Sequence, residues 1–138
     1  MSRIERLFDI PSELVLGTRI NERVPEADQR RQRREVEEIM RRLRRQPGVI
    51  LADEVGMGKT FVALGCAYSV AVRKKSGPVV VMVPANLIDK WVQDLNAFCA
   101  LYLEHREPVQ RGEATLKELR RPTAVRYGVA RHSVDLMK

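Results

Sequence analysis

The stretch that decides the fold reads Leu51-Ala52-Asp53-Glu54-Val55-Gly56-Met57-Gly58-Lys59-Thr60. A short apolar run, residues 49–52, leads into it, and a longer apolar run, residues 61–72, follows it. The short, continuous run predicts a strand that is buried on both faces of a parallel sheet. The longer run is rich in alanine, which favours a helix that is buried on most sides. The stretch therefore predicts a glycine-rich loop between a strand and a helix.

This loop carries the residue types that bind the phosphates of a nucleotide. Its glycines let successive backbone N–H groups point into one concavity, and the helix that follows adds the positive end of its dipole. Lys59 is placed to reach the β- and γ-phosphates, and the Thr60 hydroxyl is placed to ligate Mg²⁺. The strict phosphate-loop pattern has glycine where this chain has Asp53, so a chance Gly-Lys-Thr turn is the alternative. The strand–loop–helix context favours the phosphate loop.

An arginine-rich helix is predicted upstream of the loop, over residues 29–45. Its apolar residues recur at helical spacing, on one face: Val36, Ile39, Met40 and Leu43. Most of its arginines have an acidic residue four positions away, and such pairs stabilise a helix by a few tenths of a kcal/mol each. We therefore interpret its charged surface as a solvated, self-paired face rather than a nucleic-acid patch. The Pro47-Gly48 pair ends the helix.

A second strand and helix are predicted downstream of the loop. Residues 79–83 are β-branched apart from Met82, which indicates a second buried strand. Apolar residues then repeat at helical spacing from Leu87 to Cys99, and Asn86 is expected to cap the start of that helix. We expect Trp91 to pack on the apolar face of this helix. Together the elements from 48 to 100 predict a βαβ unit of a parallel sheet, with the next helix begun. Beyond residue 100 the pattern is weaker, with short helices predicted over 114–121 and from Ser133.

Composition excludes several classes of protein. The chain has 138 residues, 44% of them hydrophobic, and a formal net charge of +7, which argues against disorder. It has no apolar run of the length that crosses a bilayer, and its first residues lead into no apolar signal segment. Cys66 and Cys99 are far apart and form no CxxC motif, so we expect two reduced, buried cysteines in a cytoplasmic protein.

The order of these motifs resembles that of superfamily 2 helicases and, within them, of the Swi/Snf-type ATPases. That family has Leu-Ala-Asp-Glu-x-Gly-x-Gly-Lys-Thr as its first motif, which residues 51–60 match, so Asp53 is expected there. Its next motif is an apolar strand, a proline, a capping residue, a leucine and a tryptophan. Val79–Val83, Pro84, Asn86, Leu87 and Trp91 have this order and spacing. The resemblance covers about residues 29–100.

The resemblance implies ATP and Mg²⁺ as ligands of this chain. The implied ATP-binding residues are Gln32, Asp53, Glu54, Val55, Gly56, Met57, Gly58, Lys59 and Thr60. Lys59 and Thr60 are the catalytic candidates, with Thr60 the Mg²⁺ ligand. Gln32 is the better candidate for contact with adenine and Gln29 the second, although Arg31 stands where the family often has an aromatic residue or histidine.

The resemblance also implies a nucleic-acid partner, duplex DNA being the favoured one. Pro84, Asn86 and Lys90 are the implied contacts to its backbone. An exposed helix N-terminus beside a lysine is physically suited to phosphate. The other interpretation is that Asn86 only caps its helix.

The fold implied is an incomplete RecA-like P-loop NTPase lobe, an α/β structure with a parallel sheet and crossover helices. We expect residues 1–28 to be a leader and residues 29–138 to be part of a helicase ATP-binding domain that continues past the C-terminus. The reason is that no apolar strand ending in Asp-Glu-x-His follows Thr60 in these residues, although such a motif holds Mg²⁺ and orients the attacking water. Two alternatives remain open: a different P-loop NTPase, and a nucleic-acid- or protein-binding module with a relict loop.

Overall fold

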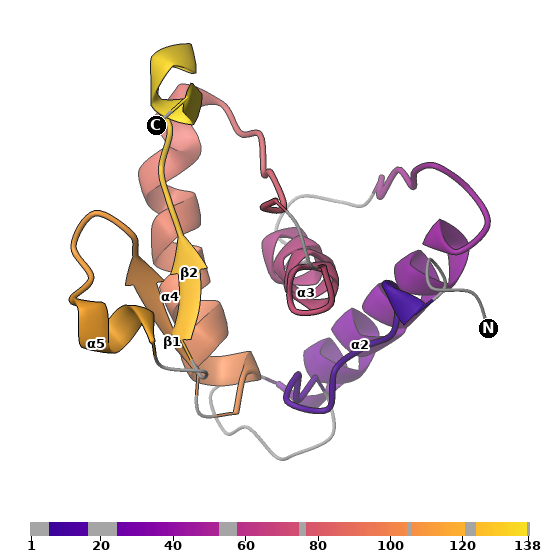
Figure 1. The fold of residues 1–138 in the computed structure, drawn as a ribbon. Helices are drawn as coiled ribbons and strands as arrows, with labels where there is room; N and C mark the ends of the chain where they lie inside the picture. The colour runs from indigo at the N-terminus through magenta and orange to yellow at the C-terminus, as the bar shows by residue number, and fades with distance from the viewer. Residues whose placement is uncertain are drawn as a thin grey trace. The chain divides into compact units, whose positions relative to one another are not determined.

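The structure is a computed structural model that describes residues 6–16, 25–52, 58–74, 77–104, 106–120 and 124–137. The chain divides into two compact units, residues 1–81 and residues 82–138, each with its own packing. Unit 1 contains the helices α2 (Glu26–Leu43) and α3 (Lys59–Ala71). Unit 2 contains η1 (Ala85–Leu87), α4 (Ile88–Tyr102), β1 (Glu107–Gln110), α5 (Leu116–Leu119), β2 (Ala124–Tyr127) and η2 (Ser133–Met137) (Figure 1).

Unit 1 is built on the contact between α2 and α3. The predicted apolar face of α2 is confirmed: Val36 and Met40 are fully buried, and Ile39 and Leu43 are half-buried. On α3, Gly65 allows a close approach to α2, because a Cβ added there would lie 3.2 Å from Val36 Cγ2. Both helices begin earlier than predicted, α2 at Glu26 instead of residue 29 and α3 at Lys59 instead of residue 61.

The N-terminal segment, residues 6–16, completes the core of unit 1. Leu14 and Leu16 are each only 2% exposed, and both lie near Gly65 of α3. Arg33 of α2 donates a hydrogen bond to the Leu16 carbonyl at 2.9 Å. The apolar burial and the hydrogen bond tie this segment to the two helices, so the described part of the expected leader is part of the core.

Tyr68 of α3 donates a hydrogen bond from its hydroxyl to Glu13 Oε1 of this N-terminal segment at 3.0 Å. We expect Tyr68→Phe to lower the free energy of unfolding by about 1 kcal/mol, because it leaves the part-buried carboxylate without this donor. Chemical denaturation monitored by circular dichroism measures the change. Glu13→Gln keeps an acceptor oxygen and serves as the control, with a smaller loss expected. An equal loss for both variants would show that the carboxylate charge matters more than the hydrogen bond.

The two strands predicted around the glycine-rich loop are wrong for this structure. Residues 49–52 and 79–83 are described as neither strand nor helix, and Ile50 is 93% and Met82 91% exposed. A buried parallel strand needs hydrogen-bonded neighbours, and neither run pairs with another strand among the described residues. High β-propensity alone therefore does not produce a strand here.

A parallel strand pair instead forms in unit 2, where the sequence pattern is weak. β1 pairs with β2 in register from Glu107 opposite Ala124 to Gln110 opposite Tyr127. The connection between them includes α5, which starts with a capping box between Thr115 and Glu118. The prediction of a parallel α/β arrangement is thus confirmed only in its coarse form, as a mixed α/β structure with one described parallel pair.

The core of unit 2 lies along α4, which packs against β1. Phe98, Cys99 and Tyr102 are each at most 2% exposed, and the rings of Phe98 and Tyr102 are 5.7 Å apart. The start of this helix differs from the prediction. Asn86 lies inside the 3-10 turn η1 and does not cap α4, whose N-cap position is occupied by Leu87 with no side-chain hydrogen bond.

Candidate nucleotide site

The candidate site is the start of α3, where Gly58 turns the chain into the helix. Gly58 has φ +73° and ψ 25°, the left-handed conformation that favours glycine, and its carbonyl accepts the first helical hydrogen bonds, from Phe61 and Val62. Residues Asp53, Glu54, Val55, Gly56 and Met57 lie outside the described residues. The described part of the predicted loop is therefore Gly58, Lys59 and Thr60.

Gln32 of α2 lies directly against this turn. A Cβ added to Gly58 would collide with Gln32 Nε2, so the amide occupies the space that any side chain at residue 58 would need. Gln32 is 4% exposed, as is Gln29 one turn earlier. The contact with Gly58 places Gln32 beside the predicted phosphate loop. Glycine is thus required at residue 58 for two reasons, the backbone conformation and the Gln32 side chain.

Lys59 and Thr60 are the first two residues of α3, and both are half-buried. The first turn of α3 contains no acidic residue, so the positive end of the helix dipole is not offset by a carboxylate of its own helix. A lysine at this end of a helix is electrostatically unfavourable for the helix itself. It becomes favourable when a polyanion binds there, since the backbone N–H groups, the dipole and the ammonium group then act on the same charge.

These residues fit a nucleotide phosphate with Mg²⁺ chemically. Lys59 supplies a mobile cation, Thr60 supplies a hydroxyl of the kind that hard cations accept, and Gln32 supplies an amide that both donates and accepts. These three side chains lie at the same end of α3. Lys59 and Thr60 are its first two residues, and Gln32 contacts Gly58 directly before them.

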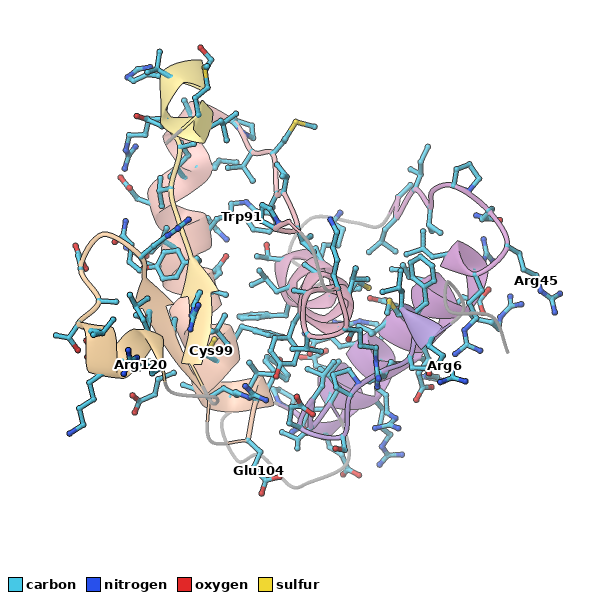
Figure 2. All side chains as sticks on the ribbon, in the orientation of Figure 1. Arg6, Arg45, Trp91, Cys99, Glu104 and Arg120 are labelled. Atoms are coloured by element: carbon cyan, nitrogen blue, oxygen red, sulfur yellow. The ribbon has the colours of Figure 1, made fainter. Side chains whose placement is uncertain are left out.

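The residues predicted to contact nucleic acid lie in unit 2, on η1 and the first turn of α4. Pro84, Asn86 and Lys90 are all exposed. Lys90 Nζ pairs with Asp94 Oδ2 at 2.5 Å, one turn further along α4, so a phosphate would have to compete with a carboxylate for this ammonium group. Trp91, labelled in Figure 2, is half-buried on the same helix.

The two cysteines are unreactive in this structure. Both are free thiols, Cys66 half-buried on α3 and Cys99 buried on α4. Burial raises the pKa of Cys66 to about 12 and that of Cys99 to about 11. Because the thiolate is the nucleophile and the metal ligand, neither cysteine is suited to catalysis or metal binding at neutral pH.

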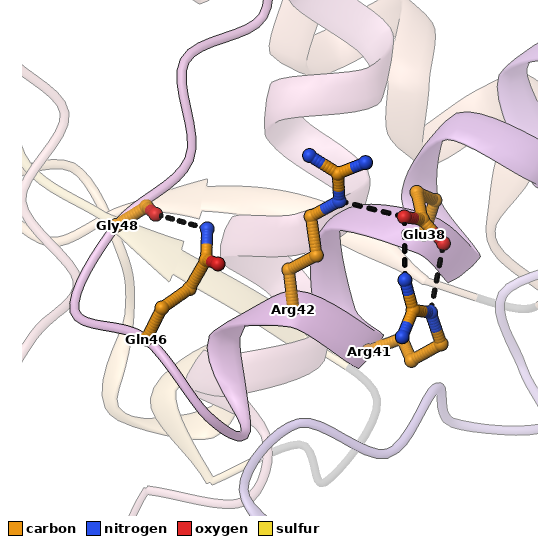
Figure 3. A network of polar contacts seen from close by, with 5 residues as sticks. All are labelled: Glu38, Arg41, Arg42, Gln46 and Gly48. Carbon is orange, nitrogen blue, oxygen red and sulfur yellow. Dashed lines mark hydrogen bonds and ion pairs between the residues drawn. The ribbon is translucent and has the colours of Figure 1, made fainter.

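The C-terminal end of α2 is held by a compact ionic network (Figure 3). Glu38 accepts two hydrogen bonds from Arg41, at 2.7 and 2.8 Å, and one from Arg42 at 2.6 Å. The hydrogen bonds from Arg41 and then Arg42 lower the pKa of Glu38 from 4.5 to about 2. The predicted self-pairing of α2 is confirmed in kind, although Arg41 pairs with Glu38, three residues back, and not with an acidic residue four positions away.

We expect Glu38 to stay ionised until the pH approaches 2. Its pKa is lowered in the folded state, so the stabilisation from these pairs is present above pH 4.5 and is lost as the pH falls through about 2. Carboxyl carbon shifts followed by NMR titration measure this pKa. The double variant Arg41→Gln/Arg42→Gln should return it towards 4.5. A wild-type value already near 4.5 would contradict the network.

Comparison with known proteins identifies the family. Residues 31–113 match the SNF2-related domain, and the chain belongs to this family. The resemblance to the Swi/Snf-type ATPases inferred from the motifs is thereby confirmed. No solved structure matches the chain.

Three relatives illustrate the extent of the similarity. The SWI/SNF-related matrix-associated actin-dependent regulator of chromatin subfamily A containing DEAD/H box 1 of Xenopus tropicalis is 43% identical over 37% of this chain. The chromodomain-helicase-DNA-binding protein 1-like of Danio rerio is 38% identical over 41% of it, and the ATP-dependent helicase fft2 of Schizosaccharomyces pombe is 30% identical over 58% of it. The matched part spans only 5%, 6% and 6% of these three relatives.

Among the described residues, no helix has both the length and the apolar character needed to cross a bilayer. The expectation of a cytoplasmic protein stays a prediction.

Proposed function

We propose that this chain binds ATP with Mg²⁺ at the start of α3, as the nucleotide-binding part of a DNA-dependent ATPase or translocase. The observation that carries the proposal is the placement of Gln32 against Gly58, directly before Lys59 and Thr60. Membership of the SNF2-related domain family supports ATP and Mg²⁺ as the ligands. The Schizosaccharomyces pombe relative is named an ATP-dependent helicase, which supports the reaction class.

The proposed roles follow from the chemistry of each side chain. We assign the phosphates to the backbone N–H groups of Gly56, Met57 and Gly58, and we count Asp53, Glu54 and Val55 among the ATP-binding residues because they belong to the same family motif. Lys59 would neutralise the charge of the β- and γ-phosphates, and the Thr60 hydroxyl would hold Mg²⁺, which would supply further positive charge against the phosphates. Gln32 hydrogen-bonds the adenine edge.

DNA is the proposed partner of the surface formed by Pro84, Asn86 and Lys90. Backbone phosphates suit this surface because it combines an exposed helix start with an exposed lysine. The name of the Danio rerio relative describes that protein as a DNA-binding helicase, which supports the same partner here. In the complete enzyme, ATP hydrolysis would be coupled to movement along duplex DNA.

The 138-residue chain is expected to bind Mg-ATP but not to hydrolyse it at a useful rate. Hydrolysis requires a carboxylate that orients the attacking water, and no Asp-Glu-x-His motif follows Thr60 in these residues. A phosphate-release assay with and without duplex DNA measures the rate. DNA-stimulated release that is abolished in Lys59→Ala would contradict this expectation.

A nucleic-acid-binding module with a relict loop is the second candidate function. The basic composition, with a net charge of +7, is the observation that favours it. Calorimetry with Mg-ATP and anisotropy with labelled duplex DNA separate the two functions. Mg-ATP binding that needs Lys59 supports the ATPase, whereas DNA binding in the absence of any Mg-ATP binding supports the module.

A further inference from the structure

Unit 1 has a charged surface at its end where α2 and α3 both finish. We call it the basic end and define it by Arg41, Arg42, Arg44, Arg45, Arg73 and Lys74, all of which are exposed. Asp9 joins the two helix ends: its carboxylate pairs with Arg44 at 2.6 Å, and its backbone carbonyl accepts a hydrogen bond from Arg73 at 3.0 Å. Residues far apart in the sequence thus supply one surface.

The acidic residues that pair with the basic end do not neutralise it. The carboxylate of Glu38 is shared by Arg41 and Arg42. The carboxylate of Asp9 pairs with Arg44, whereas Arg73 bonds only the Asp9 backbone carbonyl. Arg45 projects from the end of α2 (Figure 2), and it has no ion-pair partner within the described ranges. Six cations against two carboxylates leave an excess of four positive charges.

Favourable interaction with the helix dipoles does not account for this excess of positive charge. The C-terminal end of a helix carries about half a negative charge, so two helices together balance only about one cation. Like-charged side chains this close repel one another, which favours the binding of a polyanion across them.

The basic end is also separate from the candidate nucleotide site. Lys59 lies at the first turn of α3, whereas Arg73 and Lys74 follow its last residue, Ala71. A helix of 13 residues is about 20 Å long, which is too far for one nucleotide to reach both ends.

We propose that the basic end binds the phosphate backbone of duplex nucleic acid, as a contact surface additional to residues 84–90. Five of its six cations are arginines, whose guanidinium forks match phosphate oxygens in pairs. The exposed large hydrophobic residues among those described include no aromatic ring, so a single strand stacked on aromatic residues has no platform here. The sequence contains part of this surface, because four arginines lie within residues 41–45. The neighbouring acidic residues led to the interpretation of a solvated, self-paired face.

The test compares the full chain with the double variant Arg45→Gln/Lys74→Gln. Neither side chain takes part in the pairs to Asp9 or Glu38, so the packing of unit 1 is retained, and circular dichroism checks this. Anisotropy of a short labelled duplex, without nucleotide and over a range of salt concentrations, gives Kd and its salt dependence. We expect Kd to rise about ten-fold and the slope of log K against log salt to fall by about 2, one for each lost phosphate contact.

The matched control is Arg30→Gln/Arg34→Gln, which removes the same charge from the exposed surface of α2 outside the basic end. The slope of log K against log salt for this control should stay that of the wild type.

An equal change in both double variants would show that only net charge matters, and this would overturn the proposal. The proposal would also be overturned if neither double variant changed the affinity or the slope. Polyglutamate of matched charge serves as a competing probe. If it binds through Arg45 and Lys74 as tightly as DNA does, the surface belongs to an acidic protein segment, and the proposal is overturned. The DNA affinity of Lys59→Ala should equal that of the wild type, which keeps this test independent of ATP binding.

Discussion

Lys59→Ala is expected to weaken Mg-ATP binding by at least about 100-fold, because in the proposed site the ammonium group makes charge-assisted hydrogen bonds to two phosphates. Lys59 is the first residue of α3, where a cation opposes the helix dipole. Replacing it by alanine relieves that opposition, which is worth about 0.3–1 kcal/mol. Binding and helix stability should therefore change in opposite directions. Titration calorimetry measures the first and thermal unfolding without nucleotide measures the second.

Lys74→Ala is the matched control, since it removes the same side chain just past the other end of the same helix. There the cation suits the dipole, so the variant should keep the wild-type affinity for Mg-ATP and lose a little stability. Equal losses of affinity in the two lysine variants would indicate attraction by net charge rather than a site at the start of α3.

Gly65→Val is expected to lower the free energy of unfolding of unit 1 by about 3 kcal/mol. A Cβ at residue 65 would meet Val36 at 3.2 Å and Leu16 at 3.6 Å, and the two further methyl groups of valine would have to displace these fully packed neighbours. Chemical denaturation of the variant, followed by circular dichroism, measures the change in the free energy of unfolding.

Ala63→Val is the control for this substitution. It introduces the same side chain two residues earlier on α3 at an exposed position, where only the lower helix propensity of valine should matter, well below 1 kcal/mol. Similar losses for the two variants would contradict the close packing of α2, α3 and the N-terminal segment at Gly65.

The helices were predictable because their signals are local. The spacing of Val36, Ile39, Met40 and Leu43 decides which face of α2 is buried, and the apolar run after Thr60 decides α3. The strands were not predictable in this way, because a strand forms only when it makes hydrogen bonds to residues distant in sequence. Residues 79–83 have the composition of a buried strand and remain unpaired, while β1 and β2 pair with little sequence signal.

The candidate site was partly predictable for the same reason. The sequence order alone places Lys59 and Thr60 beside Gly58. Gln32 was predicted only from the family resemblance, because its distance along the chain says nothing of its position in space. The left-handed turn at Gly58 and the packing of α2 on α3 bring Gln32 there. The part played by Leu14 and Leu16 was not predicted, because residues 1–28 lack a periodic apolar pattern.

The most direct test of the nucleotide site is an NMR titration of the ¹⁵N-labelled chain with Mg-ATP. We expect saturable shifts centred on the backbone amides of Gly58, Lys59 and Thr60 and on the side-chain amide of Gln32, since these groups meet at one helix end. The same titration without Mg²⁺ should give weaker binding. Shifts confined to the basic end, Arg41 to Arg45 and Arg73 to Lys74, with none at Gly58 or Gln32, would contradict it.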